Sequence, residues 1–293
     1  MLPHAQAFLT DLVSHKARKI NTSEAYRGDL EKLAVYLNDS LGRPASLEDI
    51  SAVRVAAFLK KEQRSGLSPR TLARRKAALR QYARYLRSQS EKKNQFEAIE
   101  NVLGKSSFLP PAPESKITKL SKAESERLKA LLSESTRPLT RRDRAIFSIL
   151  LDTGIPVGHL VGLDCRDFVT AMAKLRSPAE GHWIQLSREG AGRALGDYLG
   201  QGRPELNPAS AVTALFISQT GSRMSRQGVW QALRIWGRRA ELPFPLSPRV
   251  LQYSAVQRLC EQGISLERLG EHLGHTNLES TRALVRRLDI RVN

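Results

Sequence analysis

A stretch rich in proline and serine divides the chain and constrains its fold more than any other feature. Residues 105–117, KSSFLPPAPESKI, have no periodicity, whereas the segments on both sides carry apolar residues three and four positions apart. Such a stretch is typical of an extended linker. With 293 residues, the chain is long enough for two domains of ordinary size. We therefore expect one domain over residues 1–104 and another over residues 118–293.

Helical patterns dominate both predicted domains. Residues 3–104 fit four helices, of which the clearest is SPRTLARRKAALRQYARYLRS, where Ser68 can cap the helix and Pro69 lies in its first turn. In the second domain, the segment from about Phe168 to Leu186 predicts a short sheet because HWIQL has strand character. Helical patterns precede and follow that segment. The expected fold class is mostly α with a small β-sheet.

The charge of the chain points to a polyanionic partner. Lysine and arginine outnumber aspartate and glutamate by 47 to 29, so the net charge is +18, and residues 1–117 and 118–293 each carry half of this excess. Such a balance favours nucleic acid, although an acidic protein surface or an anionic membrane would also satisfy it. The helix after Ser68 is a candidate DNA-binding element, with solvation of its polar face as the alternative. Its candidate contacts are Arg70, Arg74, Arg75, Arg80 and Arg84.

Several other classes of protein are disfavoured by the sequence. Cys165 and Cys260 are far apart, and Gly274 interrupts the spacing between His272 and His275, so we expect no metal site. The glycines of REGAGRALG do not match a nucleotide-binding pattern, so we expect no cofactor. No apolar run approaches membrane-spanning length, and the N-terminus lacks the apolar core of a signal peptide. These features predict a cytoplasmic protein without a membrane partner.

Four phrases, in this order, resemble a known family. They are SPRTLARRKAALRQYARYL, RDRAIFSILLDTGIPVGHLVGLDCRDF, LFISQTGSRMSRQGVWQALRIWGRRA and LSPRVLQYSAVQRLCEQGISLERLGEHLGHTNLESTRALV. They resemble the tyrosine recombinase or phage integrase family, in particular the Xer-like bacterial recombinases that resolve chromosome dimers. The resemblance implies an N-terminal helical core-binding (SAM-like) domain and a catalytic-type domain. It also implies a C-shaped clamp around duplex DNA.

The chemistry implied by this resemblance is phosphoryl transfer to a tyrosine, which leaves a covalent protein–DNA intermediate. Two arginines and a lysine or histidine offset the charge of the phosphate, and a general acid protonates the leaving oxygen. The chain departs from this pattern at four positions. Pro156 stands in place of the first arginine, Arg249 in place of a histidine, Gln252 in place of the second arginine and Leu284 in place of the tyrosine.

Three more positions bear on catalysis. Ser177 stands near the family's lysine, with Lys174 as the alternative, and His275 matches the family's late histidine or tryptophan. Tyr253 is the last tyrosine of the chain and the candidate for a substitute nucleophile. From the departures together we expect an inactive homologue, not an enzyme. The alternative is an active recombinase with a displaced active site.

The resemblance also suggests DNA contacts in the second domain. The segment SRMSRQGVW, with Arg223, Arg226 and Gln227, is similar to a place where a helix start meets DNA in this family. Arg249 and His275 are further candidates for phosphate contact. A surface arginine and a histidine that closes a helix end are the alternatives. The two tryptophans in this region, at positions 230 and 236, are expected in the core.

The expected function is that of a non-catalytic, regulatory or accessory DNA-binding factor in recombination, plasmid replication or transcription. Its locus would be a mobile element, a plasmid or a phage-derived region. Only nine residues follow Leu284, whereas the family often adds a helix that docks into a neighbouring protomer. We therefore expect monomeric or dimeric binding to double-stranded DNA, with an active recombinase as a further candidate partner. The alternative is a protein-interaction subunit that binds an active recombinase and not DNA.

Overall fold

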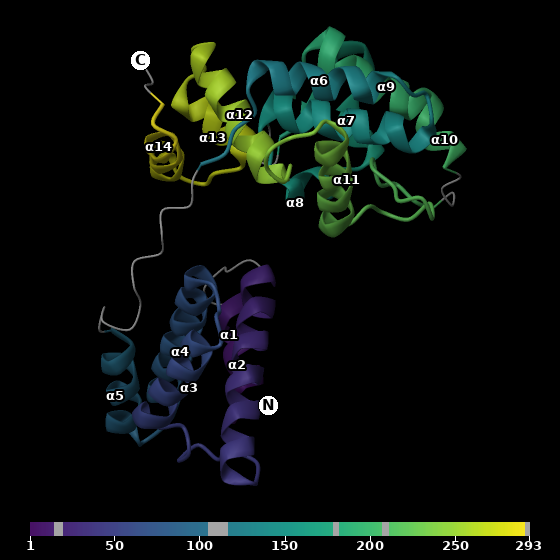
Figure 1. The fold of residues 1–293 in the computed structure, drawn as a ribbon. Coiled ribbons are helices and arrows are strands. Elements are labelled where there is room, and N and C mark those ends of the chain that lie inside the picture. Colours follow the sequence, from purple (N-terminus) through teal and green to yellow (C-terminus); the bar gives the residue numbers. More distant parts are fainter. Residues whose placement is uncertain (15–19, 105–116, 178–181, 207–210, 291–293) are drawn as a thin grey trace. The chain divides into compact units, whose positions relative to one another are not determined.

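The chain divides into two compact units, Met1–Ser115 and Lys116–Asn293, each described here by itself (Figure 1). The structure is a computed structural model that describes residues 1–14, 20–104, 117–177, 182–206 and 211–290. The expected linker, residues 105–117, falls outside the described residues except for Ile117. The two expected domain ranges therefore stay a prediction.

The described part of unit 1 is all helical. Its helices are α1 (Ala5–Ser14), α2 (Ile20–Leu41), α3 (Ala52–Arg64), α4 (Pro69–Gln89) and α5 (Lys93–Gly104). The expectation of four helices is wrong, because the helical pattern after Ser68 breaks at residues 90–92 and restarts as α5. The predicted start of α4 is confirmed: Ser68 Oγ accepts a hydrogen bond from the N–H of Thr71, and Pro69 is the first helical residue.

One apolar cluster holds unit 1 together. Phe8, Leu33, Phe58, Leu79 and Phe96, one from each of the five helices, belong to it and are almost fully buried. Burying side chains of this size removes about 2–3 kcal/mol each of unfavourable hydration, so the cluster supplies unit 1 with its own core.

Unit 2 is also mostly helical and contains one small sheet. Its longer helices are α6 (Lys122–Ser133), α7 (Pro138–Thr153), α11 (Arg226–Arg239), α12 (Pro248–Glu261), α13 (Leu266–Leu273) and α14 (Leu278–Arg287). Its shorter helices are α8 (Val157–Leu160), α9 (Arg193–Asp197) and α10 (Arg203–Glu205), and its strands are β1 (Phe168–Val169), β2 (Lys174–Arg176) and β3 (Trp183–Gln185). The predicted fold class is confirmed.

The three strands form an antiparallel sheet in the order β1-β2-β3. Leu175 of β2 pairs with Ile184 of β3, and both side chains are buried, whereas Arg176 and Trp183 on the other face are exposed. This alternation packs one face of the sheet on the core of unit 2.

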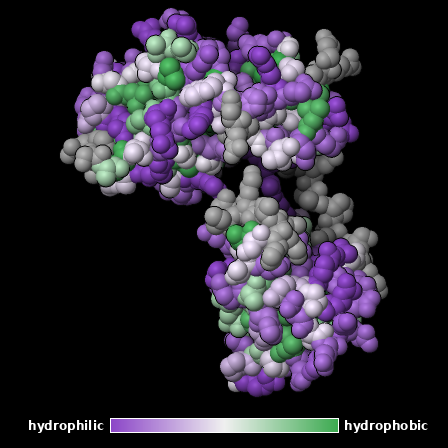
Figure 2. Space-filling view, turned by 180° about the vertical axis from the view of Figure 1, so that it is seen from behind, coloured by the Kyte–Doolittle hydropathy of each residue, from purple (hydrophilic) through white to green (hydrophobic). Residues whose placement is uncertain are grey.

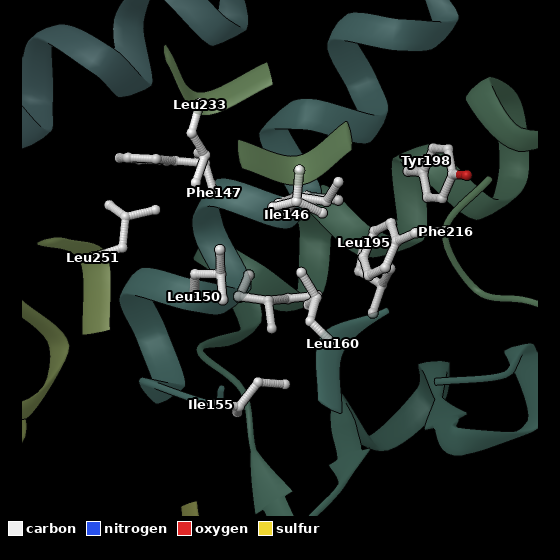
Figure 3. Close-up of a cluster of buried hydrophobic side chains, with 14 of the residues drawn as sticks. Ile146, Phe147, Leu150, Ile155, Leu160, Leu195, Tyr198, Phe216, Leu233 and Leu251 are labelled. Carbon is white, nitrogen blue, oxygen red and sulfur yellow. The ribbon is translucent and has the colours of Figure 1, made fainter. Parts of the chain in front are cut away.

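The main core of unit 2 surrounds α7. Ile146, Phe147 and Leu150 of α7 lie among side chains from α8, α9, α11 and α12 (Figure 3). A second, smaller cluster joins α12, α13 and α14 through Tyr253, Leu269 and other buried residues. The face of the molecule in Figure 2 is mostly hydrophilic, with hydrophobic residues in small patches. No helix among the described residues is long and apolar enough to span a bilayer.

Candidate nucleic-acid interface

Helix α11 gathers arginines without any acidic residue. Its sequence, RQGVWQALRIWGRR, contains four arginines and no aspartate or glutamate. Ser225 starts the helix, because its Oγ accepts a hydrogen bond from the N–H of Gly228 at 3.0 Å. The apolar side chains Val229 and Leu233 face the core, so the four arginines lie on exposed positions. Helix α11 therefore presents a cationic face to solvent.

Three of these four arginines have no acidic partner within the described part of unit 2. Arg234, Arg238 and Arg239 form no ion pair with a carboxylate of any described residue. Arg234 stacks on the ring of Trp230, with its guanidinium carbon 4.6 Å from the ring centroid, and Arg239 lies 4.9 Å from the ring of Trp236. Stacking of this kind orients a guanidinium group and leaves its charge in place.

The two tryptophans of α11 have different environments. Trp236 is buried and its Nε1–H donates a hydrogen bond to Asp143 Oδ2 at 2.9 Å, which confirms its expected place in the core. Trp230 is 37% exposed, so the same expectation is wrong for this residue. Its position lies on the outer face of α11 together with exposed Gln227 and Ile235. The outer face thus offers amide and apolar side chains besides arginine.

Most arginines of α4 form ion pairs with carboxylates of unit 1. Arg74 pairs with Asp29 and also donates to Ala25 O, while Arg84 and Arg87 both pair with Glu100. The carboxylates of Asp29 and Glu100 are buried, so these ion pairs hold the three guanidinium groups against unit 1. Arg70 and Arg80 are exposed and pair with no carboxylate of the described residues. Arg70 and Arg80 are therefore the predicted α4 contacts with the best access to a ligand.

Arg75 is the clearest departure from the predicted contacts. Its side chain is 1% exposed, and it pairs with Asp29 and Glu62 beneath the surface of unit 1. Its guanidinium carbon also lies 5.7 Å from the ring centroid of Phe58. Arg75 cannot reach DNA from this position, so the prediction that Arg75 contacts DNA is wrong.

Arg223, another predicted contact, is held by the loop that follows α8. It donates hydrogen bonds to the carbonyl oxygens of Val161 and Leu163 and pairs with Asp164 at 2.5 Å. The bond from Arg223 lowers the pKa of the Asp164 carboxyl below its ordinary value. Arg223 thus joins two segments of unit 2, and its contact with DNA stays a prediction.

The turn between α7 and α8 meets α12 and α13. Gln252 Nε2 donates to Gly154 O at 3.1 Å, and His272 Nδ1 lies 3.2 Å from Thr153 O. Pro156, two positions after Gly154, has an extended backbone and immediately precedes the first residue of α8. The fold therefore brings Pro156 and Gln252, separated by 96 positions in the printed sequence, to the same turn.

The remaining positions of the implied active site also lie on these elements. Ser177 Oγ donates to Glu271 O at 2.8 Å, which ties the end of β2 to α13. His275 follows the left-handed Gly274 that ends α13, and its Nδ1 lies 2.9 Å from Thr281 Oγ1 at the start of α14. Leu284 of α14 packs against the cluster of α12, α13 and α14. For His275, this geometry supports the alternative of a histidine that closes a helix end.

Burial affects the acid–base behaviour of His272. It lowers the pKa of the His272 imidazole below its ordinary value, and the bond with Thr153 O offsets this effect only in part. His272 is therefore neutral near neutral pH and serves as a hydrogen-bonding group between α13 and the end of α7.

Arg249 and a residue that sequence reasoning missed, Arg287, both lie against Tyr253. Their guanidinium carbons are 5.3 and 5.8 Å from the ring centroid of Tyr253. Arg287 follows Leu284 by three positions in the basic last turn of α14, so it lies on the same side of the helix. This spacing was the signal that could have identified Arg287.

Among the described residues, no group of three or more His, Cys, Asp or Glu side chains could hold a metal ion.

Comparisons with known proteins find a family match in each of the two units. Residues 120–289 match the phage integrase family, and residues 5–90 match the phage integrase N-terminal SAM-like domain. "Tyrosine recombinase XerD" of Listeria innocua serovar 6a is 31% identical over 280 residues, which cover 94% of this chain and 90% of that protein. "Tyrosine recombinase XerC" of Herpetosiphon aurantiacus is 30% identical over 286 residues, which cover 96% and 89%.

Solved structures share the fold. The XerH site-specific recombinase bound to a palindromic difH substrate, in a post-cleavage complex, matches with a TM-score of 0.71 and 21% identity over 96% of this chain and 81% of that one. The Tn1549 transposon integrase in complex with transposon right end DNA matches with a TM-score of 0.66 and 16% identity over 96% and 93%. At these identities the likeness establishes the fold.

The comparisons contradict the expectation that the chain is not an enzyme. Its similar proteins are named as tyrosine recombinases, which are enzymes, and they cover nearly the whole chain. The expectation of an inactive homologue rested on the departures at Pro156, Arg249, Gln252 and Leu284, with Ser177 near the position of the lysine. Their identity is a fact of the sequence, but no comparison shows that an active site has been lost.

Proposed function

The chain belongs to the phage integrase family of tyrosine recombinases, and from this premise we propose that it binds duplex DNA at specific sites in site-specific recombination. The observation that carries the proposal is the outer face of α11. It combines Arg234, Arg238 and Arg239, which no described carboxylate neutralises, with exposed glutamine, tryptophan and isoleucine side chains. Such a face fits a negatively charged and chemically patterned surface, which is what a DNA groove offers.

The side chains of α11 divide into two kinds of contact. Arg234 and Arg238 suit phosphate oxygens or guanine, whose O6 and N7 accept two hydrogen bonds from one guanidinium group. Gln227 suits adenine in the same way, and Ile235 suits the methyl group of thymine. Contacts to phosphate supply affinity, and contacts to base edges supply selectivity between sequences. On this proposal, Arg70 and Arg80 of α4 add phosphate contacts from unit 1.

The proposal is tested by selecting fragments of host genomic DNA on the purified protein at near-physiological salt and sequencing those retained. We expect a discrete enriched sequence, such as an inverted repeat. Uniform retention would contradict site specificity, and absent retention would contradict DNA binding. The genes beside the retained sequence would also identify the locus as a mobile element, a plasmid or a phage-derived region, and would reveal an active recombinase encoded there.

A pair of matched variants tests the role of α11. Substituting Arg234→Ala together with Arg238→Ala removes two positive charges from its exposed face. Substituting Arg127→Ala together with Lys129→Ala removes the same charge from the exposed face of α6. If both arginines contact phosphates, the plot of log affinity against log salt becomes shallower by about 1.8, because each contact contributes about 0.9. Equal effects of the two pairs would show that overall charge, and not α11, determines binding.

Strand transfer is a second candidate function, favoured by the names of the similar proteins. In this chain it would use a displaced site, for which Tyr253 is the candidate nucleophile. Tyr253 is 5% exposed, and its Oη accepts a hydrogen bond from Arg249 Nε at 2.5 Å. Attack by Oη on phosphorus, with the phenol proton passing to a general base, would form a phosphotyrosine bond and break the bond from phosphorus to a DNA oxygen. That oxygen would leave as a hydroxyl after it takes up a proton from a general acid.

Covalent capture on a nicked duplex tests this second candidate. The candidate requires a protein–DNA adduct that withstands denaturation and that is lost in Tyr253→Phe but retained in Tyr85→Phe, which removes a phenol from unit 1. Absence of an adduct from the unaltered protein on its own selected site would remove this candidate and leave the DNA-binding proposal in place.

A further inference from the structure

The outer face of the small sheet carries an exposed tryptophan beside two cationic side chains. Trp183 of β3 is 47% exposed, and Lys174 and Arg176 of β2 lie on the same face. We propose that this face binds single-stranded DNA, with the indole of Trp183 stacked on an unpaired base and the two cations beside the phosphates. The inference is independent of the duplex binding proposed for α11, because it assigns a separate site in unit 2.

The register of the sheet places these side chains together. Arg176 and Trp183 are directly opposite each other, and in the next pair along, the N–H of Ser177 donates a hydrogen bond to His182 O at 3.0 Å. Arg176 and Trp183 are therefore a non-hydrogen-bonded pair, in which the side chains approach each other most closely. Lys174 lies diagonally across from Trp183, within the reach of a long side chain. The three side chains thus form one contiguous patch.

The ring of Trp183 is the tryptophan ring of the chain that is most open to a ligand. Trp236 is buried, and arginines of α11 lie against the rings of both Trp230 and Trp236. Among the described residues, no aromatic ring and no cationic group stacks on Trp183. A base that stacks on the indole would remove its apolar surface from water.

The charge of the outer face favours nucleic acid over a basic or neutral partner. Its outward residues include no carboxylate and are Val169, Lys174, Arg176, Trp183 and Gln185. Arg176 is 59% exposed, and its Nη1 donates to Asp167 Oδ1 at 3.3 Å, so the guanidinium group is held while its other donors face a ligand. No described carboxylate pairs with Lys174. A phosphate backbone complements these two cations.

The exposed indole favours an unpaired strand over a duplex. Within a duplex each base is covered by its neighbours in the stack, so an aromatic side chain stacks on a base only where that base has left the helix or was never paired. Stacking of this kind tolerates any sequence, because every base has a π-face. We therefore expect single strands to bind with little sequence preference and with a strong dependence on salt.

The test titrates the full chain with oligothymidylate, which does not pair with itself, and follows tryptophan fluorescence and the anisotropy of a dye on the strand. We expect binding to quench tryptophan fluorescence. Trp183→Ala should weaken binding at least about fivefold, the smallest effect of losing one base stack. Trp183→Phe should keep most of the affinity and lose most of the quenching. Val53→Ala, which removes an exposed apolar side chain from unit 1, should change neither signal.

The charge contact is tested with Arg176→Gln, which keeps a hydrogen-bond donor for Asp167 and removes the charge. The plot of log affinity against log salt should become shallower by about 0.7, the contribution of one phosphate contact on a single strand. Arg188→Gln removes an exposed arginine elsewhere in unit 2 and should change the slope much less. A strand of abasic sugar-phosphate units should bind the unaltered protein at least about fivefold more weakly than oligothymidylate.

The inference is wrong if the unaltered protein does not bind oligothymidylate, or if Trp183→Ala binds it equally well. It is also wrong if polyglutamate binds in its place and depends on Trp183, because the face would then be a protein-binding surface. Melting temperatures are measured alongside. If Trp183→Ala lowers its own, the retained affinity and lost quenching of Trp183→Phe decide the question. Single-strand binding without selection of a duplex site would contradict the proposed function alone, and the reverse would contradict this inference alone.

Discussion

Arg75 illustrates how burial changes the role of an arginine. From the sequence, Arg75 was predicted to contact DNA like the other arginines of its helix. In the structure its guanidinium group instead pairs with Asp29 and Glu62 in the interior of unit 1. Removing one partner of a buried ion pair leaves an uncompensated charge, which costs about 3–5 kcal/mol. We therefore expect Arg75→Ala to destabilise unit 1 by this amount, whereas Arg70→Ala should change stability by less than about 0.5 kcal/mol.

Chemical denaturation followed by two signals checks this prediction. The three tryptophans of the chain lie in unit 2, so tryptophan fluorescence reports on that unit, while circular dichroism reports on the helices of both. In Arg75→Ala the transition by circular dichroism should gain an early phase, and the fluorescence transition should stay where it is. A shift of both transitions would show that the two units unfold together.

His272 provides a pH dependence for unit 2. Its pKa is lowered in the folded protein, mainly by burial, so the unfolded chain binds a proton more readily. The resulting stabilisation is fully present above the unfolded pKa of about 6.5 and is lost as the pH falls through the lower folded value.

Fluorescence-detected unfolding between about pH 7.5 and pH 5 measures this dependence. We expect His272→Gln to flatten the profile, because glutamine does not titrate. His182→Gln serves as the control, since that side chain is half exposed. An unchanged profile in His272→Gln would assign the pH dependence to other groups.

At the scale of the element, the position of α11 depends on a glycine. A Cβ atom built on Gly237 would lie 2.7 Å from the Cβ of Leu246, so the helix approaches the segment before α12 too closely for a side chain. Gly196 in α9 is also helical, but nothing lies within 4 Å of a Cβ there. The two glycines thus form a matched pair in unit 2.

Alanine substitutions separate these two situations. Gly237→Ala should destabilise unit 2 by about 1–3 kcal/mol through overpacking. Gly196→Ala should be neutral or stabilising by up to about 1 kcal/mol, because alanine is the better helix former. Unfolding followed by tryptophan fluorescence measures both. A neutral Gly237→Ala would mean that α11 can shift on the core, and its DNA affinity should then be measured as well.

At the scale of the whole molecule, each unit has its own core and its own share of the charge. The cluster of unit 1 contains no residue of unit 2, and the two clusters of unit 2 contain none of unit 1. Residues 1–117 and 118–293 each carry half of the net charge of +18. Residues 1–104 and 117–293, produced separately, should therefore both fold and both bind DNA weakly.

Joining the two units should increase affinity without new contacts, because the second unit binds from a high local concentration. We expect the intact chain to bind a selected site at least about a hundredfold more tightly than either piece, measured by fluorescence anisotropy at one salt concentration. If the intact chain and residues 117–293 bind with equal affinity, unit 2 alone is responsible for DNA binding. The expected domain boundaries would be wrong if either piece failed to fold.

Local sequence patterns determined much of the architecture. Ser68 with Pro69, and Ser225, start helices because a hydroxyl can satisfy a free backbone N–H wherever the chain enters a helix. Apolar residues three and four positions apart identified the helices, and HWIQL identified a strand of the small sheet. The family followed from four phrases in a fixed order. These signals depend on residues close together in the sequence, so the sequence alone is enough to recognise them.

Tertiary structure alone decided which charges are available. Arg75 and Arg70 lie on one helix, but the carboxylates that neutralise Arg75 come from α2 and α3. Trp230 and Trp236 differ in exposure because only one faces Asp143 of α7. Arg249 and Arg287 both lie against the ring of Tyr253 because α12 and α14 share an apolar cluster. Electrostatic contacts depend on distance in space, and residues far apart in the sequence set that distance.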